Sequence, residues 1–213
     1  MGRRAVPSID PSLDLHRHLK TLDQLPEPWD PVALFGREAP LEVEVGSGKG
    51  LFLQNAARAM PEHNFLGIEV AHKYARFSAS RLAKRQLDNA VMVSGDGLRL
   101  FREMLPNASL AAVHVYFPDP WWKKRHRKRR VLTPEFLADA ARTIQSDGLF
   151  HFWTDVEEYF HTTLELLADV ADLRGPEPVE EKSPEHDLDY RTHFERRKRK
   201  DGLPIYRSVF TRV

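Results

Sequence analysis

Apolar residues follow two patterns along the chain, one typical of strands and the other typical of helices. Short apolar runs that end at glycine, proline or charged residues predict strands at residues 41–45, 65–70, 91–93, 110–117, 149–153 and 205–212. Apolar positions that recur about every 3.6 residues predict helices at residues 51–60, 72–87, 98–105 and 156–170, with another helix beginning after Thr133. This alternation predicts an α/β fold with a doubly wound, mostly parallel sheet and helices on both faces.

Two regions depart from the alternating pattern. Residues 1–40 are rich in proline, and we expect an irregular N-terminal arm over residues 1–36 followed by one domain over residues 37–213. Residues 174–190 are acidic and contain proline, which predicts a mobile loop. A length of 213 residues fits one domain with additions.

Composition narrows the class of protein. Hydrophobic residues make up 41% and charged residues 30%, which is typical of a soluble globular chain. Cysteine is absent, so the chain has no disulfide, thiolate zinc site or cysteine nucleophile. With neither a secretory signal nor an apolar run of about 20 residues, we expect a cytoplasmic protein.

Positive charge is concentrated in two short segments, although the net charge is only +1. Residues 123–130 carry seven positive charges and residues 196–200 carry five, so the rest of the chain has a net charge of −11. Two cationic segments on an acidic body favour a polyanionic partner that contacts one surface. A solvated, purely structural role is the alternative for both segments.

A glycine-rich loop follows the first long predicted strand and has the sequence Glu44-Val45-Gly46-Ser47-Gly48-Lys49-Gly50. Glycines let the backbone turn sharply and approach a ligand closely. A phosphate-binding P-loop requires different residues at positions 43 and 50, and a dinucleotide loop would have glycine at position 51. An S-adenosylmethionine loop, which binds a ligand without phosphates, and an ordinary glycine turn remain.

Acidic residues end three consecutive predicted strands, at Glu44, Glu69 and Asp96. Glu69 lies 23 residues after Gly46, close to the spacing at which an acid accepts hydrogen bonds from ribose hydroxyls. Asp96 is placed to accept a hydrogen bond from an adenine amino group. An anionic pocket suits a sulfonium ligand and opposes a pyrophosphate, which favours S-adenosylmethionine over NAD.

The fourth long strand runs into Phe117-Pro118-Asp119-Pro120-Trp121-Trp122 and then into the basic run. Two prolines restrict the backbone around Asp119 and aim its carboxylate, as positioning catalysis requires. The tryptophans offer faces on which a base can stack beside cations that bind its phosphates. The alternative is a structural turn with buried tryptophans.

These residues resemble the bacterial tRNA (guanine-N7)-methyltransferase family. The resemblance covers roughly residues 40–213, and its most specific part is Phe-Pro-Asp-Pro-Trp followed by Lys123 and the basic block. It continues in Gly67-Ile68-Glu69, Thr154-Asp155 and Thr192-His193-Phe194-Glu195. One departure is Trp122, where the family more often has proline or histidine. The resemblance implies a class I, Rossmann-like methyltransferase that methylates N7 of guanosine 46 in the variable loop of tRNA.

The resemblance also implies the roles of individual residues. S-adenosylmethionine would be bound by Glu44, Gly46, Gly48, Glu69, Asp96 and Asp119, and Asp119 would be the catalytic residue. Substrate would be bound by Lys123, Asp155, Thr192, His193, Phe194 and Glu195. The tRNA-interacting segment would be Arg125, His126, Arg127, Lys128, Arg129 and Arg130, and residues 1–36 receive no role.

Structural roles remain open for some of these residues. Thr192 and Glu195 have the spacing of a capping box, and Asp155 could cap the helix that follows it. The histidines have no metal-binding spacing, so we expect no metal. We also expect no membrane partner, and a monomer or weak homodimer. Alternative functions are methylation of another RNA or of a small molecule, an NAD-dependent oxidoreductase and a noncatalytic RNA-binding module.

Overall fold

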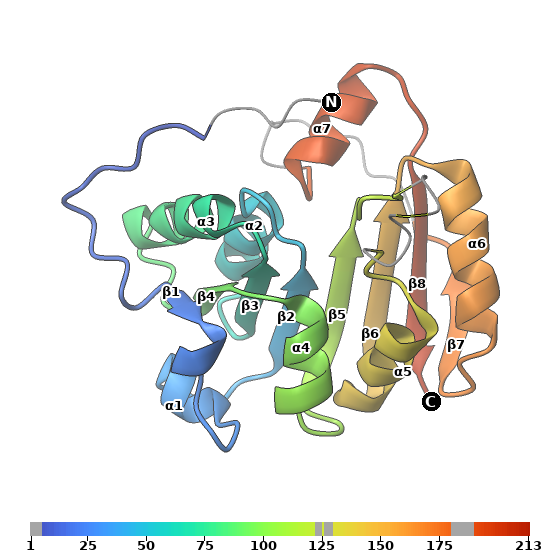
Figure 1. Cartoon of the computed structure of the whole chain (residues 1–213), viewed down its shortest axis with the longest axis horizontal. Coiled ribbons are helices and arrows are strands. Elements are labelled where there is room, and N and C mark those ends of the chain that lie inside the picture. Colours follow the sequence, from blue (N-terminus) through green and yellow to red (C-terminus); the bar gives the residue numbers. More distant parts are fainter. Residues whose placement is uncertain (1–5, 122–124, 126–129, 180–189) are drawn as a thin grey trace.

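An eight-stranded sheet organises the structure, in the strand order β1-β4-β3-β2-β5-β6-β8-β7 (Figure 1). This computed structural model describes residues 6–121, 125, 130–179 and 190–213. The strands are β1 (Leu19–Thr21), β2 (Leu41–Val45), β3 (Asn64–Glu69), β4 (Ala90–Ser94), β5 (Leu110–Tyr116), β6 (Ile144–Thr154), β7 (Leu173–Glu177) and β8 (Tyr206–Arg212). Only β8 runs antiparallel to its neighbours β6 and β7. The expected doubly wound, mostly parallel sheet is therefore confirmed.

Helices connect the strands, and some of them begin at a side-chain cap in the sequence. They are α1 (Pro31–Phe35), α2 (Leu51–Ala59), α3 (His72–Lys84), α4 (Gly97–Arg99) with a π turn (Leu100–Met104), α5 (Pro134–Thr143), α6 (Glu157–Ala168) and α7 (His193–Lys200), with a 3-10 turn at Leu22–Gln24. Thr133 caps α5 by accepting a hydrogen bond from the Phe136 N–H at 3.3 Å, and Pro134 is the first helical residue.

Two apolar clusters pack on the two faces of the sheet. One contains Phe52, Leu53, Ala79 and Leu82, which come from α2 and α3. The other contains Phe101, Leu137 and Leu167 from the π turn, α5 and α6, together with Phe35 from α1. Because both faces are covered, the central strands are buried on both sides.

The strand order reverses between β2 and β5, which pair directly with each other. To one side of this point the sheet continues with β3 and β4, and to the other side it continues with β6. In doubly wound sheets, ligands bind beyond the carboxyl ends of the strands at this reversal. The loops after β2 and β5 therefore form the natural position for a site.

Both regions that the sequence predicts to be irregular contain regular structure. In the N-terminal arm, β1 pairs with β4, and α1 begins at Pro31 with Asp30 accepting hydrogen bonds from two of its N–H groups. Residues 173–177 form β7, so the expected loop over residues 174–190 is wrong at its start, and residues 180–189 lie outside the described residues. The three-residue β1 and the five-residue α1 are too short to show a period, and β7 contains glycine and proline.

Candidate active site

The glycine loop after β2 turns through three glycines with positive φ angles. Gly46, Gly48 and Gly50 have φ values of 79°, 53° and 69°, in the left-handed region that favours glycine. At Gly50 a Cβ atom would also lie only 1.8 Å from the Ser78 hydroxyl of α3. The third glycine is thus required by close packing of the loop against α3, whereas the first two leave the space above the loop open.

Glu44, the last acid on β2, is buried with only 4% of its surface exposed. Its Oε2 atom has no hydrogen-bond partner among the described residues. Burial, with a smaller contribution from the charge of Glu69, raises the pKa of Glu44 to about 8. A buried carboxyl oxygen without a partner fits a cationic group of a ligand, such as the ammonium group of an amino-acid moiety.

Glu69, at the end of β3, holds the glycine loop in place. Its Oε2 accepts a hydrogen bond from the Gly48 N–H at 3.0 Å, and its Oε1 accepts one from the Ala71 N–H at 2.8 Å. Each carboxylate oxygen can accept a further bond, so this support leaves capacity for ligand hydroxyls.

A pocket of about 510 Å³ opens between the ends of β2, β3, β4 and β5. We call it the Asp96 pocket, and its acidic lining residues are Glu69, Asp96 and Asp119. Asp96 also caps α4 by accepting a hydrogen bond from the Leu98 N–H at 2.9 Å. The structure thus brings together three of the acids that the sequence predicts for a cofactor site.

The Asp119 loop after β5 is strained on both sides of the aspartate. Phe117 and Trp121 have φ values of 51° and 42°, which are uncommon for residues with a Cβ atom. Arg130 fixes the same loop, since its Nε donates a hydrogen bond to the Pro120 carbonyl at 2.7 Å. Asp119 itself is exposed at the pocket. Such strain is typical of functional loops.

A second pocket, of about 170 Å³, lies on the other side of the glycine loop. We call it the His193 pocket, and its lining includes Glu44, Lys49, Phe117, Thr192, His193 and Phe194. Gly46, Tyr116 and Phe117 line both pockets. The start of α7 and the Asp119 loop therefore meet above the strand-order reversal.

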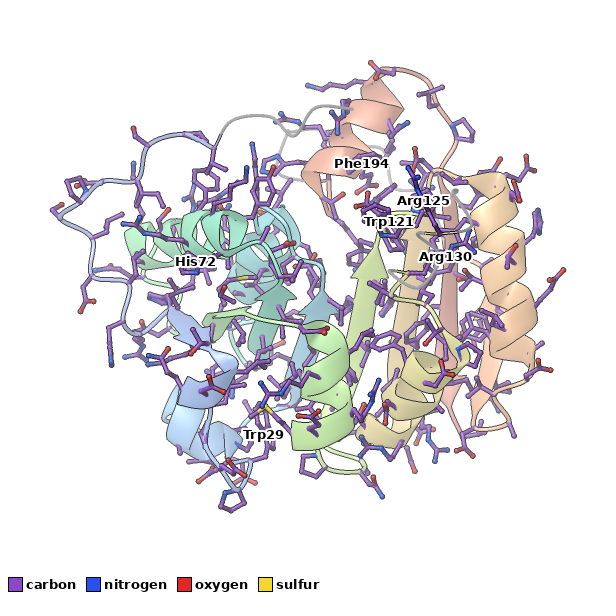
Figure 2. All side chains as sticks on the ribbon, in the orientation of Figure 1. Trp29, His72, Trp121, Arg125, Arg130 and Phe194 are labelled. Atoms are coloured by element: carbon purple, nitrogen blue, oxygen red, sulfur yellow. The ribbon has the colours of Figure 1, made fainter. Side chains whose placement is uncertain are left out.

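Helix α7 lies beyond the carboxyl ends of β2 and β5, and several contacts hold it there (Figure 1). The rings of Phe194 and Phe117 lie 5.2 Å apart, and the Lys198 ammonium group lies 2.7 Å from the Asp155 carboxylate. In Figure 2, Phe194 and Trp121 lie at this end, whereas Trp29 lies at the opposite end, beside a third pocket of about 670 Å³.

Thr192 caps α7, but Glu195 does not complete the reciprocal capping box that their spacing allows. Thr192 Oγ1 accepts a hydrogen bond from the Glu195 N–H at 3.0 Å, and Glu195 Oε2 accepts one from the Arg191 N–H at 2.6 Å. Glu195 is 3% exposed, and its Oε1 faces Arg207 and Arg199 at 3.4 and 3.5 Å. The buried side chain of Glu195 therefore stabilises the N-terminus of α7.

Asp155 does not cap the helix that follows it. Val156 occupies the cap position of α6 without a side-chain hydrogen bond, and the Thr154 hydroxyl accepts from the Val156 N–H at 3.2 Å. Asp155 instead forms the ion pair with Lys198.

His193 contacts Arg81 from α3, with 2.7 Å between His193 Nε2 and Arg81 Nη1. Because arginine only donates, Nε2 must accept, which places the single imidazole proton on Nδ1. Burial and then the positive charge of Arg81 lower the pKa of His193 to about 4. His193 is therefore neutral at physiological pH, with one fixed tautomer.

Most of the basic run cannot be placed at the site. Lys123, His126, Arg127, Lys128 and Arg129 lie outside the described residues. Figure 2 shows Arg125 and Arg130 at the same end of the sheet as Phe194. The guanidinium group of Arg130 lies 5.0 Å from the centre of the Tyr159 ring, in addition to its bond to Pro120.

A buried polar chain beneath the site was not predicted from the sequence. Glu42 on β2 accepts hydrogen bonds from His63 and His114, each at 2.7 Å. His114 Nδ1 lies 2.9 Å from the Tyr116 hydroxyl, which in turn accepts from Arg191 at 3.1 Å. The available signal was a histidine within the apolar run of β5, together with the acid on the neighbouring strand β2.

Neither a metal centre nor a membrane span is found in the described part of the chain. No group of three or more histidine, aspartate and glutamate side chains there is arranged to hold a metal ion. None of its helices is both long and apolar enough to cross a membrane.

The chain is similar to known methyltransferases over most of its length. A family described as "Putative methyltransferase" matches residues 38–208. A tRNA (guanine-N(7)-)-methyltransferase of Rhodopirellula baltica is 50% identical over 216 residues, which cover 99% of this chain and 80% of that protein. The chain belongs to the tRNA (guanine-N(7)-)-methyltransferase family. An enzyme of the same name from Aeromonas hydrophila is 36% identical and covers 90% of this chain and 81% of its own length.

A solved structure confirms the fold of this methyltransferase family member. An antibiotic-related methyltransferase superposes with a TM-score of 0.60 at 16% identity, covering 86% of this chain and 92% of that one. The expected class I methyltransferase fold and the expected family are therefore correct, and S-adenosylmethionine is the cofactor of this enzyme class. The glycine loop, the unpartnered Oε2 atom of Glu44 and the acidic Asp96 pocket fit that cofactor.

Proposed function

We propose that this methyltransferase transfers a methyl group from S-adenosylmethionine to N7 of a guanosine in tRNA, and that the target is guanosine 46 in the variable loop. The observation that carries the proposal is the convergence of the glycine loop, the Asp119 loop and the start of α7 on adjoining pockets. The two relatives named above support the choice of tRNA and of N7 through their names.

The cofactor would occupy the Asp96 pocket and extend over the glycine loop. Glu69 would accept hydrogen bonds from the ribose hydroxyls, and Asp96 would accept one from the adenine amino group. Glu44, beneath Gly46 and Gly48, would bind the ammonium group. When bound, the cofactor supplies an electrophilic methyl group on a sulfonium.

Methyl transfer to N7 requires mainly that the reacting atoms be aligned and that the moving positive charge be offset. Guanine N7 has a lone pair and no proton, so no general base is needed to activate it. As the methyl group moves, positive charge moves from sulfur to the guanine ring. Asp119 is rigidly held at the pocket and would offset that charge or accept hydrogen bonds from the guanine N–H groups.

Substrate binding would fall to the residues around the His193 pocket and to the basic run. Asp155 and the segment from Thr192 to Glu195 would position the nucleotide, together with Lys123, and residues 125–130 would bind the tRNA backbone. For Asp155 this role requires it to share or exchange its contact with Lys198.

The decisive experiment is transfer of tritiated methyl groups to unmodified tRNA, followed by mapping of the modified base. Formation of N7-methylguanosine at position 46 supports the proposal. Methylation at another position, or of another RNA or a small molecule only, would refute it.

A further inference from the structure

Arg81 on α3 has a half-buried guanidinium group with no carboxylate partner among the described residues. Its Nε donates a hydrogen bond to Gln54 Oε1 at 2.9 Å, and its Nη1 donates to His193 Nε2 at 2.7 Å. Both acceptors are neutral. The side chain is thus held in one place by two bonds that leave its charge uncompensated.

Other cations are directed toward the same place. Burial, and then the charges of Arg85 and Arg196, lower the pKa of Arg81 to about 10. The pKa of His193 is lowered by burial and by Arg81, and further by Arg196 and Lys49. Cations from the glycine loop, α3 and α7 therefore act on one small region, an arrangement that attracts an anion.

This region adjoins the His193 pocket, where the target nucleotide would enter. His193 and Lys49 line that pocket directly. The acid in the pocket, Glu44, would be paired with the ammonium group of the cofactor and so would not neutralise the region. An anion that reaches Arg81 would therefore meet a positive surface.

The position of Arg81 differs from that of the basic run. Arg81 belongs to α3, on the side of the sheet that carries β3 and β4, whereas Arg125 and Arg130 lie beyond β5 on the other side of the site (Figures 1 and 2). An RNA strand whose base enters between them has backbone on both sides. Two cationic contacts on opposite sides fit that geometry.

We propose that Arg81, held by Gln54 and His193, binds a backbone phosphate of the tRNA on the α3 side of the target nucleotide. This inference rests on the proposed function, because it takes tRNA as the substrate. Arginine suits the task, since its planar N–H groups match two phosphate oxygens and it remains charged when half-buried. Gln54 and His193 then act as positioning residues for Arg81.

The test measures binding of unmodified tRNA to the full chain over a range of salt concentrations. Arg81→Gln is expected to weaken binding roughly tenfold at moderate salt. It should also make the log–log salt dependence shallower by about 0.7–0.9, the value for one phosphate contact. Arg81→Lys keeps the charge, so the salt dependence of its tRNA binding should stay close to that of the parent.

A matched control is Lys84→Gln, which removes one charge from the same helix. Lys84 is exposed near Asp10 in the arm, away from the His193 pocket, and its loss should leave affinity and slope close to those of the parent. S-adenosylmethionine affinity, measured by calorimetry, should be the same in all the variants.

Three results would overturn the inference. Unchanged tRNA affinity and slope in Arg81→Gln would exclude a contact, and weaker binding with the parental slope would mean that Arg81 only supports α7. Loss of S-adenosylmethionine affinity would assign Arg81 to the cofactor carboxylate. Each of these differs from failure of the proposed function, in which the parent protein itself would form no N7-methylguanosine in tRNA.

Discussion

The hydroxyl group of Tyr116 on β5 accepts a hydrogen bond from Arg191, the residue immediately before the Thr192–Glu195 segment. An ionised Glu42 can only accept, so His114 Nε2–H must donate to it. The Nδ1 atom of a neutral His114 then accepts from the Tyr116 hydroxyl. Every member of this buried chain is thus fixed in direction. It connects the centre of the sheet to the start of the segment that would bind substrate.

Burial opposes ionisation of Glu42, yet the hydrogen bonds from His114 and His63 lower its pKa below the ordinary value. Burial in turn lowers the pKa of His114, so its imidazole stays neutral. An ionised Glu42 and a neutral His114 agree with the direction that the hydrogen bonds require.

Removing the hydroxyl in Tyr116→Phe should leave His114 Nδ1 and Arg191 each without a partner. We expect a loss of about 1–3 kcal/mol in the free energy of unfolding, the usual cost of an unsatisfied buried group. We also expect KM for tRNA to rise more than kcat falls, because Arg191 would no longer fix the substrate segment. Urea unfolding and steady-state kinetics measure the two effects. Tyr159→Phe is the control, because it removes a buried hydroxyl that has no hydrogen-bond partner among the described residues and keeps the ring beside Arg130. It should leave both the stability and KM for tRNA close to those of the parent.

Glu44 should make the cofactor-free protein less stable as the pH rises. Its pKa is raised in the folded state to about 8 from an ordinary value of 4.5, so between these pH values the folded protein binds more protons than the unfolded chain. The free energy of unfolding therefore falls through this window, by at most about 1.4 kcal/mol per pH unit. Glu44→Gln removes the decline, so the variant should gain about 3 kcal/mol relative to the parent between pH 5 and pH 8. Parallel stability curves for the two proteins would contradict the assignment.

The same carboxyl group should release a proton when the cofactor binds at pH 7. An ammonium group beside Glu44 favours its ionised form and so lowers its pKa. Calorimetry of S-adenosylmethionine binding in buffers of different ionisation enthalpy measures the released proton. Glu44→Gln should abolish this release and weaken binding, and an equal release in the variant would assign the proton to another group.

Asp119→Asn keeps the shape of the side chain and removes its charge. Because the Asp119 loop is held by Arg130 and by the strained residues on each side, the fold should be unchanged. Turnover should fall on the order of 10²-fold, as for other losses of one preorganised electrostatic group. Single-turnover methyl transfer gives the rate and circular dichroism checks the fold. A rate near that of the parent would remove Asp119 from catalysis.

Changing Arg125, Lys128 and Arg129 together to serine tests the basic run, most of which lies outside the described residues. If these residues neutralise phosphates, tRNA binding should weaken and the salt slope should become shallower by up to two or three units. Different tRNA sequences should be affected alike, because phosphate contacts do not read bases. The same affinity and slope as in the parent would mean that the run is only a solvated surface.

The sequence predicted the long elements and the place of the site because these depend on local patterns. The strands β2 to β6, the cap at Thr133 and the loops at Gly46 and Asp119 carry such patterns, and all are present. The residues of α1 also carried a cap at Asp30 and a terminating Gly36, but five residues between them are too few for a period to show. The strands β1 and β7 depend on pairing with distant strands, which a local pattern cannot reveal.

The contacts of the site residues could be predicted from the sequence less well than their positions. Acids that alternate with apolar residues, as in β2, usually mark a face exposed to water, yet Glu42 and Glu44 are both buried. Glu42 is tolerated because histidines from two other strand regions reach it, and Glu44 because it faces a pocket. Partners such as Arg81 for His193 and Lys198 for Asp155 come from helices remote in sequence. Their contacts follow only from the folded chain.

The short strand β1 has a consequence for how the protein behaves when its N-terminal region is damaged. Leu19–Thr21 covers the outer side of β4, whose residues Ala90–Ser94 are mostly apolar. Cleavage that removes β1 would bare a row of unpaired main-chain groups on an apolar strand, a template for joining a second copy. Strand β1, which lies outside the expected domain, thus protects the β4 edge of this methyltransferase from pairing with a second copy.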